Sequence, residues 1–148
     1  RDTIGSDGQD KLINGERIQF SDIGIAYDTN SSAGEVAKLL GAVFGRESVA
    51  NNAFVGIGLD LKNKGMSYVD LAELAINETG RSTPEDIVAL LWTNVVGSPP
   101  NAQQAQPFVD MLNNGTTVGE LGVLAAETDL NVANINLIGL ANSGIEYI

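Results

Sequence analysis

Apolar and polar residues alternate with helical spacing along most of this chain. From Ser31 onward, apolar side chains recur three or four positions apart, which places them on one face of an α-helix. Val36, Leu39, Leu40 and Val43 form one such stripe, and Ile87, Leu90, Leu91 and Val95 form another. The spacing predicts helices over residues 32–44, 50–63, 67–78, 84–96, 101–113, 117–127 and 130–140.

Start and stop signals bracket these segments. A hydroxyl or asparagine side chain can accept from a free amide of the first turn, and an acid or glutamine three positions later supports the same turn. The pairs are Ser32 with Glu35, Ser67 with Asp70, Thr83 with Asp86, Asn101 with Gln104, and Thr117 with Glu120. Glycines at positions 45, 65, 97 and 115 follow predicted helices, where a left-handed cap favours them.

The first part of the chain has β character instead. Asn14-Gly15 separates the apolar-rich segments 11–13 and 16–20 and suits the positive φ angles of a type I′ turn. A second turn at 21–24 precedes another short strand at 25–27. We expect a hairpin that packs on the helices or continues an upstream sheet, because an isolated ribbon is only marginally stable.

The helical part contains an internal duplication. Residues 36–45 match residues 88–97, and residues 59–75 match residues 109–125 after a length difference of two residues. Both copies carry Asn-x-Gly, at 63–65 and 113–115, followed by a hydroxyl residue and an acid with capping spacing. One such unit cannot bury all of its apolar surface, whereas two units packed together can.

These patterns predict a mainly α, α+β fold, with a short N-terminal β-ribbon packed on a duplicated helical bundle of about six or seven helices. The expected domains are the ribbon, residues 1–30, and the helical domain, residues 31–148. Within the helical domain, the units span about 32–80 and 84–130, followed by a C-terminal helix and tail.

Aromatic side chains are expected mainly in the core. Trp92 lies on an apolar stripe, and bulky aromatic residues are usually largely buried. The same expectation covers Phe44, Phe54, Tyr68 and Phe108. The C-terminal Tyr147-Ile148 is expected to be exposed, because chain ends often fray.

The charge balance disfavours several classes of partner. The 148 residues include 8 basic and 19 acidic ones, for a net charge of −11. Such a surface repels nucleic-acid phosphates and anionic lipid headgroups. No run approaches the ~20 apolar residues that a membrane-spanning helix needs. We therefore expect no nucleic-acid partner and no membrane insertion.

The residue inventory also limits the chemistry. Cysteine and histidine are both absent, which removes disulfides, thiolate or imidazole zinc sites, cysteine nucleophiles and histidine-based triads. Most carboxylates fall at helix starts or on polar faces, where capping explains them. A carboxylate-only enzyme such as a glycosidase, which needs two acids ~5–10 Å apart across a cleft, is disfavoured. We predict no catalytic residues and no enzymatic activity.

A calcium motif is the one candidate for a ligand site. Residues 5–13 follow the G-G-x-G-x-D-x-U-x repeat apart from serine at its second position, which makes Asp7 and Asp10 candidate Ca²⁺ ligands. The motif needs stacked turns in register, and Asp2 precedes Asp10 by 8 residues, one short of the repeat. The alternative is an Asp/Gly-rich turn without a metal.

The sequence resembles a known bacterial family. Residues 7–22 resemble the D-G-x-D-x-L-x-N-x-E-R-L-x-F-x-D segment of haemolysin-type (RTX) calcium-binding proteins. The duplicated helices resemble the uncharacterised helical domain that accompanies this segment and is similar to the phycobilisome-linker domain. That domain's apolar helix ending in L-G-R-x-P-D corresponds, in divergent form, to residues 43–47 and to residues 95–101. The family's aspartate after the turn is missing from the first unit and is Asn101 in the second.

The resemblance implies type I secretion and an extracellular or cell-surface location. We expect the chain, which starts at Arg1, to be part of a larger secreted bacterial protein. The expected function is a non-enzymatic structural or interaction module, whose contacts are the rest of that protein and a protein or cell-surface partner. The alternative is a calcium-responsive folding cap, with Ca²⁺ as the only cofactor. The resemblance brings no catalytic residues with it.

The calcium alternative has a direct calorimetric test. If Asp7 and Asp10 bind Ca²⁺, titration should give a saturable heat of binding that the Asp7→Asn/Asp10→Asn variant abolishes, because the hard cation needs both carboxylates. Magnesium, which demands a tighter octahedral geometry, serves as the control cation. A calorimetric trace without binding up to millimolar calcium would eliminate the folding-cap hypothesis.

Overall fold

The protein is mainly helical, as the sequence predicts. The structure is a computed structural model that describes residues 11–13 and 17–148, with side chains from residue 17 onward. Eight α-helices and one 3₁₀-helix lie in this part of the chain. They are α1 (Ser32–Phe44), η1 (Arg46–Ala50), α2 (Asn52–Asn63), α3 (Tyr68–Glu78), α4 (Pro84–Val96), α5 (Ala102–Asn113), α6 (Val118–Ala126), α7 (Asp129–Asn134) and α8 (Leu137–Ser143). The predicted fold class is confirmed.

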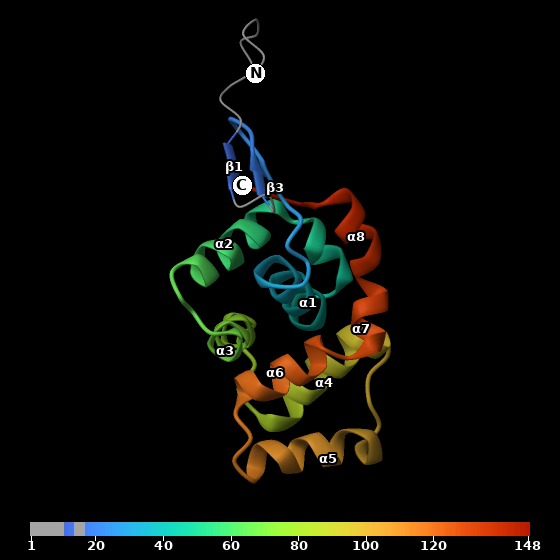
Figure 1. The fold of residues 1–148 in the computed structure, drawn as a ribbon. Coiled ribbons are helices and arrows are strands. Elements are labelled where there is room, and N and C mark those ends of the chain that lie inside the picture. The colour runs from blue at the N-terminus through green and yellow to red at the C-terminus, as the bar shows by residue number, and fades with distance from the viewer. Residues whose placement is uncertain (1–10, 14–16) are drawn as a thin grey trace, which may run out of the picture.

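Short antiparallel strands form a sheet at one end of the molecule, away from α5 (Figure 1). The strands are β1 (Lys11–Ile13), β2 (Arg17–Gln19), β3 (Gly24–Ala26) and β4 (Ile145–Tyr147), in the spatial order β1-β2-β3-β4. Strands β1 and β2 pair from Lys11 with Gln19 to Ile13 with Arg17, which confirms the predicted hairpin. The conformation of Asn14-Gly15 lies outside the described residues.

The fourth strand comes from the C-terminus, and the sequence did not reveal it. Ile145 pairs with Ala26 and is almost fully buried, while Tyr147 pairs with Gly24. A Cβ atom on Gly24 would lie only 2.2 Å from the ring of Tyr147, so the glycine makes room for this ring. The expected exposure of Tyr147 is therefore wrong, although Ile148 is exposed. Pairing between such distant segments leaves no local pattern.

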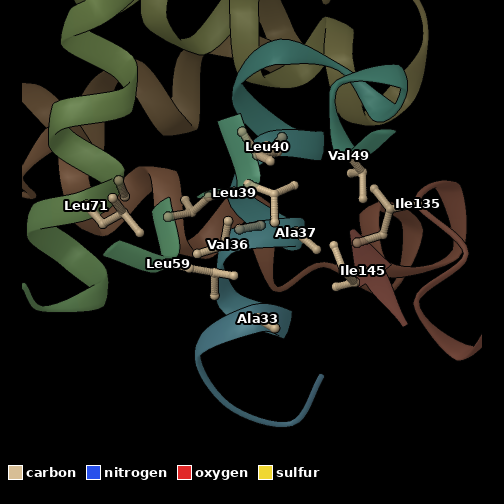
Figure 2. Close-up of a cluster of buried hydrophobic side chains, with 14 of the residues drawn as sticks. Ala33, Val36, Ala37, Leu39, Leu40, Val49, Leu59, Leu71, Ile135 and Ile145 are labelled. Carbon is tan, nitrogen blue, oxygen red and sulfur yellow. The ribbon is translucent and has the colours of Figure 1, made fainter. Parts of the chain in front are cut away.

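Helix α1 lies at the centre of the fold, with the other helices around it (Figure 1). It is buried along nearly its whole length, in contrast to an ordinary amphipathic helix with one polar face. Small residues allow neighbours to approach closely: a Cβ on Gly41 would lie 2.4 Å from the Ile135 side chain. Figure 2 shows the larger side chains of α1, such as Val36 and Leu39, packed between Leu59, Leu71 and Ile145.

The predicted duplication is present in the order and bounds of the helices. Helix α4 begins and ends 52 residues after α1, and α5 begins and ends 50 residues after α2. Helix α6 likewise begins 50 residues after α3. We call α1–α3 unit one and α4–α6 unit two.

The two units meet at equivalent positions. A Cβ on Gly119 would lie 2.3 Å from the carbonyl oxygen of Val69, its counterpart in unit one. The Asn94 side chain donates to the carbonyl oxygen of Ala42, again its own counterpart, at 3.1 Å, and to that of the next residue at 2.8 Å. Contacts between equivalent residues are the mark of an approximate two-fold axis, as in an isologous interface. Helices α3 and α6 provide the main contact across this axis.

Most predicted helix signals are confirmed. Reciprocal capping boxes form at Asn101/Gln104 and at Thr117/Glu120, and the side chains of Ser67 and Thr83 accept from first-turn amides. Glycines 45, 65, 97 and 115 all have positive φ angles at or just after helix ends.

Two helix predictions are wrong. Ser32 and Glu35 form no capping box, since α1 begins at Ser32 and its Ser31 N-cap has no side-chain cap bond. The predicted helix over 130–140 is divided into α7 and α8. The division falls at Ile135-Asn136, where Asn136 has a positive φ of 53° and its side chain caps α8.

The contact between the units predicts the effect of Gly119→Ala. Alanine gains at most about 1 kcal/mol in helix propensity, but its Cβ would collide with the backbone of Val69. We expect a net loss of about 1–3 kcal/mol in the free energy of unfolding. Urea denaturation measures it, and an unchanged or increased stability would contradict the described contact.

Candidate functional site

An apolar groove opens between the three helices of unit one. Its volume is about 440 Å³. Helix α1 contributes Val36, Leu39, Leu40 and Phe44, α2 contributes Phe54, Ile57, Gly58 and Leu61, and α3 contributes Leu71, Leu74, Ala75 and Glu78. We call this surface the unit-one groove. Among these lining residues only Glu78 is charged.

Large apolar side chains are exposed around the unit-one groove. Ile57 is 59% exposed, Phe54 42%, Phe44 38% and Leu74 37%. The rings of Phe44 and Phe54 lie 5.5 Å apart at the groove, in tilted contact. The expected burial of these two phenylalanines is therefore wrong. Clustered exposure of this kind marks binding surfaces more often than isolated apolar residues do.

Unit two has an equivalent groove that is smaller, at about 200 Å³. Counterparts of the unit-one lining residues surround it, among them Val88, Leu91, Trp92, Val96, Leu121, Leu124 and Ala125. The main difference is that Phe108 takes the place of Gly58 and Trp92 that of Leu40. The rings of Trp92 and Phe108 lie 6.0 Å apart and are half-buried, so unit two fills much of its own groove.

Gly58 explains why the unit-one groove stays open. A Cβ at this position would lie 2.7 Å from Cγ1 of Val36, so α2 approaches α1 more closely than a side chain would permit. Position 58 therefore adds no side chain to the unit-one groove. In unit two, the Phe108 ring lines the corresponding groove. Aligning the sequences of the two units pairs Gly58 with Phe108. Sequence reasoning could have found the open groove from this contrast.

A second site ties the sheet to α1. The Arg17 guanidinium contacts Asp28 through two nitrogen–oxygen pairs, at 3.2 and 3.1 Å. The Asp28 side chain, 4% exposed, also accepts from the Ser31 hydroxyl at 3.2 Å and from the Ala33 backbone N–H at 3.1 Å. Asp28 thus replaces the predicted Ser32 cap at the start of α1. Sequence reasoning missed both Arg17 and Asp28.

The pKa of Asp28 reflects these contacts. Burial alone would raise it, but the hydrogen bond from Arg17, the Ala33 amide and the Arg17 charge together hold the pKa below its ordinary value. The carboxylate therefore stays charged in the folded protein at neutral pH. A surface hollow of about 530 Å³ adjoins it and also contains Asp60, which pairs with Lys64 at 2.6 Å. Both side-chain carboxylates of this hollow are thus matched by cations.

A polar network fills the space between α1, α2, α3 and the end of α6. The Tyr68 hydroxyl donates to Glu127 at 2.8 Å, and Lys38 pairs with the same carboxylate at 2.5 Å. Lys62 pairs with Glu35 at 2.6 Å, and both lysine nitrogens lie 5.9 Å from the centre of the Tyr68 ring.

The titration behaviour of this network follows from its geometry. Burial, followed by the hydrogen bond to Glu127, raises the pKa of Tyr68 far above its ordinary value. Burial would raise the pKa of Glu127 too, but hydrogen bonds from Lys38 and Tyr68 outweigh it and lower this pKa. The tyrosine therefore stays protonated and donates to Glu127.

Unit two replaces this network with apolar residues. The counterparts of Glu35, Lys38, Lys62 and Tyr68 are Ile87, Leu90, Leu112 and Val118. The two units have therefore diverged both in their grooves and in their interiors.

The predicted calcium ligands, Asp7 and Asp10, lie outside the described residues. Within residues 11–13 and 17–148, no group of three or more acidic, histidine or cysteine side chains is arranged to hold a metal ion. None of the described helices combines the length and apolar content that crossing a membrane requires. No protein-family model, curated protein or solved structure matches the chain.

The Asp28 site predicts the result of Asp28→Asn. Asparagine lacks the charge that the buried Asp28 carboxylate offers to Arg17 and to the Ser31 and Ala33 donors, so we expect the free energy of unfolding to fall by about 3 kcal/mol at neutral pH. Since the folded pKa lies below the ordinary value of 3.8, the wild-type contribution is complete above pH 3.8 and is lost as the pH falls through the folded pKa. Urea denaturation between pH 7 and 2.5 should show this acid-dependent loss in the wild type and less of it in the variant.

Asp60→Asn is the matched control, because Asp60 pairs with Lys64 at a largely exposed position. It should change stability by no more than about 0.5 kcal/mol. Equal effects of the two substitutions would show that the Asp28 contacts are not those described.

Proposed function

We propose that this chain is a non-enzymatic interaction module of a larger secreted or cell-surface bacterial protein, and that it binds its partner through the unit-one groove. The observation that carries the proposal is the exposure of Phe44, Phe54, Ile57 and Leu74 around one concave surface. Exposing these side chains in water is unfavourable, so a groove of this kind is kept where a partner covers it.

The comparison between the units supports a binding role for this groove. Folding alone does not require an open groove, since the same scaffold in unit two holds Phe108 and Trp92 at the corresponding positions. The polar clusters already have structural tasks, as Asp28 caps α1 and Glu127 compensates Lys38. The secreted setting rests on the resemblance of residues 7–22 to the RTX-associated segment.

The groove proposal is tested by substituting Leu74 with glutamine. Glutamine keeps the length and the helix propensity of leucine but puts a polar amide on the groove wall. When the immobilised chain is exposed to the surface fraction of the producing cells, the wild type should retain a partner, and Leu74→Gln should retain at least tenfold less. Quantitative mass spectrometry of the eluates measures the difference.

Leu124→Gln is the control, because Leu124 is the counterpart of Leu74 in unit two and is similarly exposed. Thermal melts should show both variants folded, and the control should retain the partner as the wild type does. Equal retention by wild type and Leu74→Gln, or no specific retention by any of them, would count against the proposed function.

A further inference from the structure

Resting on the proposed function, we infer that the unit-one groove takes a basic amphipathic helix, whose apolar face carries a bulky or aromatic side chain and whose flanks carry lysine or arginine. Two independent features define this occupant. The shape and lining of the groove specify the apolar face, and the carboxylates of α3 that form no ion pair, of which Glu78 lines the groove, specify the charge of the flanks.

The groove has the dimensions of a short helix seat. Its α2 wall runs from Phe54 to Leu61 and its α3 wall from Leu71 to Glu78, which is about 10 Å along each helix axis. An incoming helix presents apolar side chains at i, i+3 or i+4, and i+7 over the same length, which is the usual pattern of helix-in-groove recognition.

The filled groove of unit two shows what kind of side chain fits. There, the Phe108 ring occupies the position of Gly58 and packs against Trp92 on the groove floor. In unit one, Gly58 leaves this position without a side chain. A phenylalanine at position 58 would collide with the Val36 side chain, which lies too close. An aromatic or large aliphatic side chain of the partner would take the corresponding place.

The charges on unit one select a basic partner. All the basic residues between positions 32 and 80 pair with carboxylates: Lys38 with Glu127, Arg46 with Glu47, Lys62 with Glu35, and Lys64 with Asp60. Three other carboxylates, of Asp70, Glu73 and Glu78, all lie on α3 and form no ion pair with any residue from 17 to 148. Arg81, just beyond α3, pairs with none of them.

The same charges disfavour other occupants. A second copy of the chain also carries a net charge of −11, so self-association through this surface is opposed by repulsion. Anionic lipid headgroups are repelled in the same way. A basic helix gains attraction from α3 while its apolar face covers Ile57 and Leu74.

Fluorescence anisotropy with three labelled synthetic helices tests this inference. The peptides share one leucine- and phenylalanine-bearing face, and their polar faces carry lysine, glutamine or glutamate. At low salt the lysine peptide should bind the wild type at least tenfold more tightly than the glutamine peptide, and the glutamate peptide should bind most weakly. Increasing the salt to about 1 M should remove most of the difference, because the Debye length falls to about 3 Å.

Two pairs of variants locate the binding. Leu74→Gln should abolish binding of the lysine peptide, whereas Leu124→Gln should leave it unchanged. Glu78→Gln should weaken the preference for lysine, whereas Asp110→Asn, which removes the same charge from unit two, should preserve it.

Each other outcome overturns the inference in a recognisable way. Equal binding of all three peptides that Leu74→Gln abolishes would reject the basic partner and leave the groove function standing. No binding of any peptide would reject the helical occupant, and retention of the cellular partner then decides the proposed function separately. A dimer in sedimentation equilibrium that Leu74→Gln dissociates would identify a second copy as the occupant.

Discussion

The burial of α1 is the constraint on which the rest of this structure depends. A helix surrounded on nearly all sides must offer small residues where other segments approach it closely. Gly41 does so toward Ile135, and Gly34 makes room for the backbone of Thr29 just before α1. Its polar ends must also be satisfied. Asp28 accepts from the first turn, and Asn94 of the other unit donates to carbonyl groups of the last turn. Both repeat units and the sheet are thereby joined through one helix.

Duplication gives this scaffold two versions of each site, and their divergence is informative. Equivalent residues of α3 and α6 contact each other, so the units share one approximate axis and the same local geometry. Within that geometry, the polar network around Tyr68 corresponds to apolar packing in unit two, and the open groove corresponds to one filled by Phe108. Unit two shows that a side chain of the protein itself can fill this groove. The unit-one groove is therefore open because residue 58 is glycine, and not because the fold requires an opening.

Much of the fold could be predicted from the sequence because it is encoded locally. Helix bounds follow from apolar periodicity and from capping pairs such as Thr117 with Glu120, and the repeat follows from their recurrence. The remaining features arise from contacts between distant segments. Strand β4 exists because Ile145 reaches Ala26, and Asp28 caps α1 because Arg17 on β2 lies beside it. The groove was missed because helical periodicity does not distinguish a core phenylalanine from Phe54, which faces solvent.

We propose that the unit-one groove binds a partner and that the smaller groove of unit two does not. Methyl NMR of the isotope-labelled chain, titrated with the lysine-bearing helix, measures both grooves in the same sample. We predict large, saturable shifts of the Ile57 and Leu74 methyl signals, with the Leu124 methyl signals unchanged. Shifts at Leu124 equal to those at Leu74, or saturating shifts that leave both Ile57 and Leu74 unaffected, would contradict it.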